Sequence, residues 1–257
     1  MYAFDTAVCG GRFVEVPCRA DFTLDLLAIE RVAFEMQAKV LFLASPNNPT
    51  ANAIPRAEVE RLLQLPLLVV VDEAYIEFCH QGDFVCSDYD VTDWVGKYEN
   101  LAVLRTLSKW AGLAGLRIGY GLIPEPIANQ LWKIKQPYNV SVLAQVAALA
   151  SLEDLDYLLT NIARIISERE SMLKALRELS FLSVYPSLAN FIFYRVNNGN
   201  ILHLKHLLEQ EGIIVRYFQK GRLRDHICMG IGRPEQNDIV LAVLRRYGEE
   251  VAKSSWA

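Results

Sequence analysis

Groups of polar residues follow the apolar, strand-like runs of this sequence. The first group is the loop 45–50, which reads Ser-Pro-Asn-Asn-Pro-Thr, the second is Asp72 with Tyr75, and the third is Arg-Thr-Leu-Ser-Lys at 105–109. Because ligands of open α/β sheets bind at the carboxyl ends of the strands, we expect these groups to share one edge of a sheet. Each group alone has a plainer explanation: a turn, a helix N-cap beside a packed tyrosine, or solvated surface charge.

Taken together, these residue types suit a phosphorylated aldehyde with a basic ring nitrogen. Lys109 can form an imine, because a partly desolvated lysine favours its amine form. Asp72 can keep a pyridine nitrogen protonated, so that the ring withdraws electrons. The hydroxyls of Thr106 and Ser108 suit a phosphate, as does Arg117, which stands eight residues after the lysine. The combination predicts a site for pyridoxal 5'-phosphate, whose ring oxygen would accept from the remaining amide and phenol donors.

The hydrophobic pattern predicts the elements that would position this site. Strands are expected at 12–16, 39–44, 67–71, 101–105 and 117–122, with helices at 24–37 and 56–64. Most of these strands are apolar without alternation, which is typical of parallel strands buried on both faces with helices as crossovers. Residues 1–152 are therefore interpreted as a large α/β domain with a three-layer, mostly parallel sheet.

The pattern changes after Leu122. Helices are expected at 126–135, 141–149, 155–179, 202–210 and 236–246, and short strands at 191–196, 213–216 and 227–231. This mixture of helices and short strands is typical of an α+β arrangement. We interpret residues 153–257 as a smaller C-terminal domain that the long helix joins to the large one.

Composition excludes several classes of function. The 257 residues carry 26 basic and 30 acidic side chains, a net charge of −4, which argues against a nucleic-acid partner. No apolar run approaches the ~20 residues of a membrane-spanning helix, so no membrane partner is expected. The five cysteines, an odd number, predict reduced thiols in an intracellular protein. Cys79, His80 and Cys86 lie in a polar, loop-like stretch, and we expect no metal there.

Longer segments around these groups resemble the class I/II aminotransferases, which are fold type I pyridoxal-phosphate enzymes. The matching segments are SPNNPT, VVVDEAYIEF, VLRTLSKWAGLAGLRIGYGL, KQPYNVS and GIGRPEQND. Within that group they are similar to histidinol-phosphate aminotransferases of the plant type, from Met1 almost to the C-terminus. The resemblance implies amino-group transfer between histidinol phosphate and 2-oxoglutarate, giving imidazole acetol phosphate and glutamate, in histidine biosynthesis. It also implies a homodimer and a location in plastid or cytoplasm.

The same resemblance implies roles for individual residues. Lys109 would carry the imine and shuttle a proton at the substrate α-carbon, while Asp72 would pair with the pyridinium. The remaining cofactor contacts would come from Asn48 and Tyr75 at the ring oxygen and from Thr106, Ser108 and Arg117 at the phosphate. Candidates on the substrate side are Tyr138, Asn190 and Arg216, for which packing or a solvated charge is the alternative.

The sequence also departs from the family in two ways. The resemblance begins well inside the family's large domain, so we expect the N-terminal arm, a glycine-containing phosphate loop and a ring-stacking aromatic residue to be missing. Cys228 stands where the family carries an arginine for the substrate carboxylate, and a thiol cannot form a charged, bidentate pair. Two alternatives follow: a truncated, non-catalytic relative, or a transaminase or decarboxylase of the same fold with an altered substrate.

Overall fold

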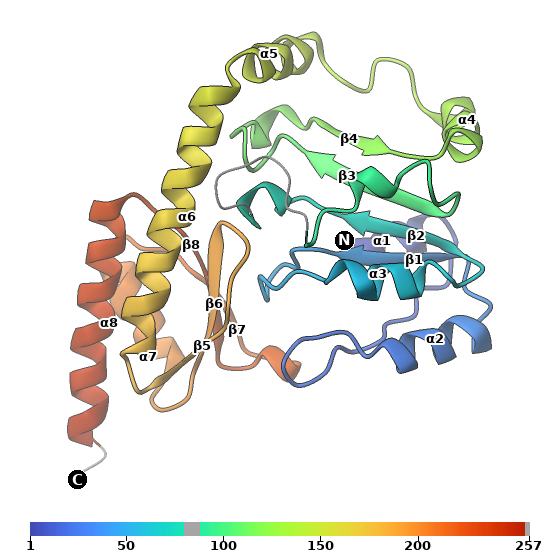
Figure 1. Cartoon of the computed structure of the whole chain (residues 1–257). Coiled ribbons are helices and arrows are strands. Elements are labelled where there is room, and N and C mark those ends of the chain that lie inside the picture. The colour runs from blue at the N-terminus through green and yellow to red at the C-terminus, as the bar shows by residue number, and fades with distance from the viewer. Residues whose placement is uncertain (80–87, 255–257) are drawn as a thin grey trace. The chain divides into compact units, whose positions relative to one another are not determined.

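The computed structural model describes residues 1–79 and 88–254, which fall into two compact units. The first unit contains the described residues of 1–46, 53–76 and 88–153, and the second contains those of 47–52, 77–79 and 154–254. Figure 1 labels the elements of both units along the chain. The two units are described separately below.

A sheet with the strand order β1-β2-β3-β4 forms the centre of the first unit. Its strands are β1 (Val40–Ala44), β2 (Leu68–Asp72), β3 (Leu101–Thr106) and β4 (Gly119–Leu122). Strands β1, β2 and β3 run parallel, and β4 pairs antiparallel with β3. The register pairs Ala44 with Asp72 and Asp72 with Leu104, so the carboxyl ends of the parallel strands meet at one edge. The predicted α/β fold with a mostly parallel sheet is confirmed.

The helices of the first unit come before, between and after these strands in the chain. They are α1 (Tyr2–Val8), α2 (Leu26–Glu35), α3 (Arg56–Leu62), α4 (Glu125–Ile134) and α5 (Val142–Glu153). The carboxylate of Asp25 caps the first turn of α2 by accepting from the Ala28 amide. Helices α2 and α3, which lie beside β1 and β2 in Figure 1, bury Ile29, Val59 and Leu62 in one core with apolar side chains of the strands.

Two expectations for this unit were wrong. Residues 12–16 form neither strand nor helix, because no neighbouring strand pairs with their backbone. Strand β1 is not buried on both faces, since it lies at the edge of the sheet and leaves Val40 43% and Phe42 41% exposed. Its side chains instead alternate, with Leu43 in the core and Phe42 against the ring of Tyr2.

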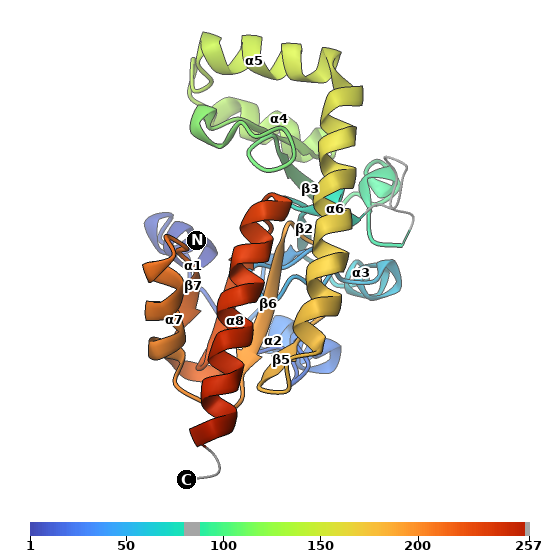
Figure 2. The same cartoon turned by 90° about the vertical axis from the view of Figure 1, so that its left-hand side faces the viewer.

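The second unit is an α+β structure with its own antiparallel sheet, ordered β5-β6-β8-β7. Its elements are β5 (Leu182–Val184), β6 (Phe191–Val196), β7 (Arg216–Phe218), β8 (His226–Gly230), α6 (Leu155–Arg177), α7 (Ile201–Gln210) and α8 (Pro234–Ser254). Figure 2 shows α8 between α6 and α7. These helices share a core with the strands, in which Leu176, Leu204 and Leu244 meet Ile192 and Ile227. None of the helices in residues 1–79 and 88–254 is long and apolar enough to cross a membrane.

Candidate active site

Asp72 ends β2 at the edge where the strand termini meet, and two donors hold its carboxylate. Oδ1 accepts from the Ala74 amide at 3.1 Å, and Oδ2 accepts from the Tyr2 hydroxyl at 2.5 Å. The Tyr2 ring stacks on Phe42 of β1, with ring centroids 4.8 Å apart. Burial, and then the hydrogen bond and charge of Asp72, raise the pKa of Tyr2, so this phenol remains a donor. The arrangement leaves a fixed, anionic acceptor at the strand end.

Sequence reasoning missed Tyr2 as a neighbour of Asp72. The two residues lie 70 positions apart, and no motif surrounds Tyr2. The available signal was weak: an aromatic residue near the start of a short segment that forms α1. Only the pairing of β1 with β2, together with the stacking of Tyr2 on Phe42, brings the hydroxyl to the carboxylate.

Tyr75 and Lys109 lie together near this acid. The chain turns after Asp72, and the Lys109 ammonium lies 5.4 Å from the centroid of the Tyr75 ring. This distance is within the range of a cation–π contact. Lys109 is exposed, so its amine is open to a ligand, and Tyr75 is half-buried. Because Asp72 pairs with Leu104 in the sheet, the acid, the phenol and the amine all follow the ends of two neighbouring strands.

The hydroxyl groups of the third sequence group form a tight turn at the end of β3. Thr106 Oγ1 accepts from the Ser108 amide at 3.1 Å and donates to the Ile118 carbonyl at 3.3 Å. The Leu107 amide donates to the same carbonyl at 3.2 Å. Both hydroxyl-bearing residues are half-buried, and these bonds fix the conformation of the turn at the strand end.

Arg117 lies two residues before Gly119, on the segment that leads into β4. Its backbone is left-handed, with φ at 53°, and its guanidinium donates to the Ala114 carbonyl at 2.8 Å. Gly119 pairs with Thr106, and a Cβ at this glycine would lie 2.6 Å from the Arg105 carbonyl. A glycine is therefore needed where this segment passes the β3 end. The exposed Arg117 remains available to an anion near the hydroxyl turn.

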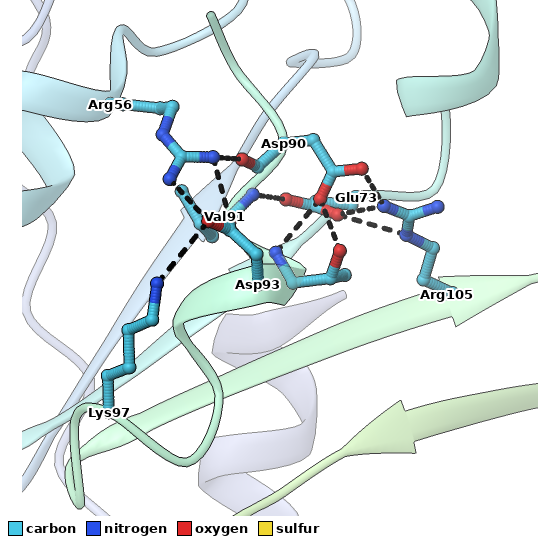
Figure 3. A network of polar contacts seen from close by, with 8 residues as sticks. Arg56, Glu73, Asp90, Val91, Asp93, Lys97 and Arg105 are labelled. Atoms are coloured by element: carbon cyan, nitrogen blue, oxygen red, sulfur yellow. Dashed lines mark hydrogen bonds and ion pairs between the residues drawn. The ribbon is translucent and has the colours of Figure 1, made fainter. Parts of the chain in front are cut away.

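A buried ion-pair network lies directly behind these strand ends and is shown in Figure 3. Arg105 donates through Nε and Nη2 to one oxygen of Glu73, at 2.9 and 2.7 Å, and through Nη2 to Asp90 at 2.8 Å. Burial raises the pKa of Glu73 to about 7, with Arg105 acting against the shift and Asp90 adding to it. Burial would also raise the pKa of Asp90, but hydrogen bonds from Thr92 and the charge of Arg105 outweigh it and keep that pKa low. Sequence reasoning did not identify this network.

The other sequence-predicted residues are more scattered. Tyr138 belongs to the first unit, and its side chain is 96% exposed, with φ at 60°. Asn48 is exposed in the second unit, in the loop that follows β1. Asn190 also belongs to the second unit, where its carbonyl accepts from the Ile231 amide at 3.0 Å. These residues therefore do not form one cluster with the β2 and β3 ends within a single unit.

Arg216 and Cys228 are neighbours in the sheet of the second unit. They pair across β7 and β8, and Phe193 pairs with Cys228 on the other side. Burial raises the pKa of the Cys228 thiol to about 11, against the charge of Arg216. Cys228 is therefore an uncharged side chain, whereas the exposed Arg216 brings a positive charge beside it, with its guanidinium 5.1 Å from the Phe218 ring.

The described residues offer no metal site. Within residues 1–79 and 88–254, no three His, Cys, Asp or Glu side chains are grouped so that they could hold a metal ion. His80 and Cys86, considered above with Cys79, lie outside the described residues.

Comparison with known proteins gives one family. Residues 1–244 match the family of aminotransferases of class I and II. The histidinol-phosphate aminotransferase of Roseiflexus castenholzii is 48% identical over 95% of this chain and 65% of that protein. The chloroplastic histidinol-phosphate aminotransferase of Nicotiana tabacum is 41% identical over 96% of this chain and 58% of that protein. The chain thus spans 58–65% of the length of these relatives.

Solved structures share the fold. The histidinol-phosphate aminotransferase from Clostridium acetobutylicum superposes with a TM-score of 0.87, at 24% identity, over 97% of this chain and 75% of that one. The histidinol-phosphate aminotransferase from Sinorhizobium meliloti, solved in complex with pyridoxal-5'-phosphate, superposes with a TM-score of 0.82, at 28% identity. This superposition covers 96% of this chain and 68% of the Sinorhizobium meliloti chain. The similarity extends over both units.

Proposed function

Because the chain belongs to the class I and II aminotransferases, we propose that it binds pyridoxal 5'-phosphate and that its protein is a histidinol-phosphate transaminase. The reaction would convert histidinol phosphate and 2-oxoglutarate to imidazole acetol phosphate and glutamate, in histidine biosynthesis. The names of the relatives from Roseiflexus castenholzii and Nicotiana tabacum support this reaction. The observation that carries the proposal is the acid, phenol and amine at the neighbouring ends of β2 and β3.

The donor set in the first unit fits this cofactor. Asp72 offers a fixed carboxylate for the pyridine nitrogen, and Tyr2 keeps that carboxylate oriented. Lys109 is the attachment point for the aldehyde, and its exposed amine can take and return a proton at the substrate α-carbon. When bound, the cofactor supplies an electron-withdrawing ring. The other proposed contacts are Asn48 and Tyr75 for the ring oxygen, and Thr106, Ser108 and Arg117 for the phosphate.

Three further residues are proposed on the substrate side. Tyr138 and Asn190 remain proposals for the substrate pocket, as does Arg216, which carries a positive charge beside Cys228. The neutral thiol of Cys228 cannot supply a charged contact to a carboxylate. The division into a cofactor domain (1–152) and a small domain (153–257) also remains a prediction.

We further propose that the protein is a homodimer. The support lies on α5, where large apolar side chains are exposed, among them Val142, Leu143, Val146 and Leu149. A contiguous exposed apolar surface of this kind is typical of a protein interface. The location remains a prediction of plastid or cytoplasm; relatives from Nicotiana tabacum and Arabidopsis thaliana, named as chloroplastic, support the plastid.

A spectroscopic titration tests cofactor binding. Purified protein is mixed with pyridoxal phosphate, and a visible absorbance band should appear that Lys109→Ala removes. Lys133→Ala is a matched control, because Lys133 is an exposed lysine of the same unit that donates to Gln130. A wild-type protein without a Lys109-dependent band would contradict the proposal.

A substrate panel with 2-oxoglutarate as acceptor tests the reaction. Turnover of histidinol phosphate, followed as glutamate formation, is the expected result. Release of carbon dioxide, or turnover of a different phosphorylated amine, would favour the same-fold alternative with another substrate. Cofactor binding without any turnover would favour the non-catalytic alternative.

A further inference from the structure

The buried network behind the strand ends connects the two halves of the candidate cofactor site. Glu73 directly follows Asp72, and Arg105 directly precedes Thr106. Side chains of successive residues in an extended strand point to opposite faces. Glu73 and Arg105 therefore meet on the face opposite to Asp72 and Thr106, while the Glu73 amide continues the β2–β3 ladder by donating to the Leu104 carbonyl at 2.9 Å.

The three side chains at the centre of this network are almost fully buried, and their carboxylates have further hydrogen bonds. The Glu73 side chain is 0% exposed, Arg105 is 9% exposed and Asp90 is 8% exposed. The second oxygen of Glu73 accepts from the Val91 amide at 2.9 Å, and Asp90 Oδ1 accepts from the Thr92 amide and hydroxyl. Both carboxylates therefore bind the guanidinium of Arg105, and each also accepts a backbone amide, from Val91 for Glu73 and from Thr92 for Asp90.

A second ion pair, Arg56 with Asp93, lies on the exposed side of the network, and we call it the outer pair. Arg56 donates to both oxygens of Asp93, at 2.7 and 2.9 Å, and to the Asp90 carbonyl. Lys97 lies 3.8 Å from Asp93, whose side chain is 55% exposed. As Figure 3 shows, this outer pair lies apart from Arg105, on the other side of Asp90. It therefore offers a way to perturb charge nearby without breaking the inner contacts.

We propose that Glu73, Asp90 and Arg105 are positioning residues, which fix the end of β2 against the end of β3 and so set the spacing between Asp72 and the Thr106–Ser108 turn. This inference rests on the proposed function, in which Asp72 meets the ring nitrogen and the turn meets the phosphate of one cofactor molecule. Buried ion pairs contribute little net stability because of desolvation, but their directional hydrogen bonds can specify one arrangement. The forked guanidinium, bonded to carboxylates from two segments, is suited to that task.

The test compares a ligand that spans both strand ends with one that does not. Pyridoxal phosphate would contact Asp72, Lys109 and the turn, whereas inorganic phosphate would contact the turn and Arg117 without reaching Asp72. If the spacing is loosened in Glu73→Gln, pyridoxal phosphate should bind about tenfold more weakly, because small misplacements of binding groups are costly. The affinity for inorganic phosphate should change by less than about twofold, since it engages the β3 end alone. Arg105→Lys, which retains charge but not the fork, should give the same pattern.

A second readout needs no cofactor. In the free protein, amide hydrogen exchange at residue 73 and at Leu107 should be about tenfold faster in Glu73→Gln, because these amides join the two strand ends to their neighbours. The Val69 amide, which donates to the Asn100 carbonyl at the other end of β2, should change little. Asp93→Asn is the matched control, since it removes the outer pair alone and should leave both readouts unchanged.

The outcomes separate this inference from the proposed function. A wild-type protein that binds no pyridoxal phosphate would contradict the proposed function, while the exchange measurement would still decide whether the network positions the strand ends. Unchanged exchange at residue 73 and Leu107 in both variants would overturn the inference. Equal weakening of inorganic phosphate and pyridoxal phosphate would also overturn it, because a loss of general stability would affect both ligands alike.

Discussion

At the scale of single residues, the hydrogen bond from Tyr2 to Asp72 shows how a distant side chain completes the acid end of the site. The Asp72 carboxylate accepts this bond at 2.5 Å, and its other oxygen accepts a backbone amide. Bonds to ionised groups are stronger than those between neutral groups. The phenol is therefore expected to stabilise the first unit as well as orient the carboxylate.

Tyr2→Phe tests this bond while keeping the ring that stacks on Phe42. We expect the free energy of unfolding of the first unit to fall by about 1.5 kcal/mol, the lower end for a charged bond because Asp72 is half-buried. Urea unfolding followed by tryptophan fluorescence suits the measurement, since Trp94, Trp110 and Trp132 all belong to this unit. Tyr2→Ala should cost more, because it also removes the stack. Wild-type stability in Tyr2→Phe would show that water replaces the phenol.

Tyr194 presents the opposite case, a phenol buried in the core of the second unit. Its side chain is fully buried in the core of the second unit, and its hydroxyl has no hydrogen-bond partner among the described residues. Burial raises the pKa of this phenol, so it stays uncharged. A buried hydroxyl without a hydrogen bond is destabilising, because it loses its contacts with water.

Tyr194→Phe should therefore raise the free energy of unfolding of the second unit by about 1 kcal/mol. Urea unfolding followed by far-ultraviolet circular dichroism would show the change. Tyr247→Phe is a useful contrast, because the Tyr247 hydroxyl donates to the Asn200 carbonyl at 3.1 Å and accepts from the Asn200 amide. That substitution should lower stability. A clear loss of stability in Tyr194→Phe would mean that its hydroxyl is bonded in solution.

At the scale of elements, β8 begins at a histidine that the second unit holds in its neutral form. The His226 ring stacks on Phe193 at 4.8 Å, and Nδ1 donates to the Arg224 carbonyl at 2.8 Å. Nε2 is then left to accept from the Tyr185 hydroxyl at 3.2 Å. Burial lowers the pKa of His226, and the nearby charge of Arg195 acts in the same direction. Protonation therefore favours the unfolded chain.

The second unit should lose stability as the pH falls below about 6.5, the ordinary pKa of histidine. The sign follows because the unfolded state binds the proton at a higher pH than the folded state does. His226→Gln should reduce this loss between about pH 7 and about pH 5, since glutamine has no proton to bind. Unfolding measured at several pH values would show the difference. Parallel curves for wild type and variant would contradict a neutral, buried His226.

The elements also show which parts of the fold the sequence pattern predicted. The apolar runs at 39–44, 67–71 and 101–105 appear as β1, β2 and β3, which pair in parallel and share an apolar core with α2 and α3. The run at 12–16, which includes the charged residues Arg12 and Glu15, has no pairing strand, and pairing depends on the whole sheet. Short elements such as α1 and β5 were not predicted, because their few residues carry little periodic signal.

The candidate site was predictable to the extent that it depends on strand ends. Asp72 and the Thr106–Ser108 turn could be placed together, because ligand sites of α/β sheets lie at that edge. The partners behind them could not be placed. Tyr2 lies 70 residues from Asp72 and Glu73 lies 32 residues from Arg105, so these contacts depend on the folded sheet and not on any local pattern.

At the scale of the whole molecule, the exposed apolar face of α5 bears on assembly. Val142, Val146 and Leu149 follow one another at helical spacing on the exposed side, while Ala144 and Ala148 are buried on the other. A monomer would leave this stripe in water at a cost in free energy. The face therefore supports the proposed homodimer, in which a second copy would cover it.

Val146→Glu places a charge in the middle of this stripe and tests that assembly. If a second copy covers α5, the charge must be buried without a partner, and the dissociation constant should rise by at least about tenfold. Sedimentation equilibrium over a range of protein concentrations would measure the change. Gln64→Glu adds the same charge at an exposed position at the end of α3 and should leave association unchanged. A monomeric wild-type protein, or a Val146→Glu variant that associates as tightly as wild type, would show that α5 is not the contact between copies.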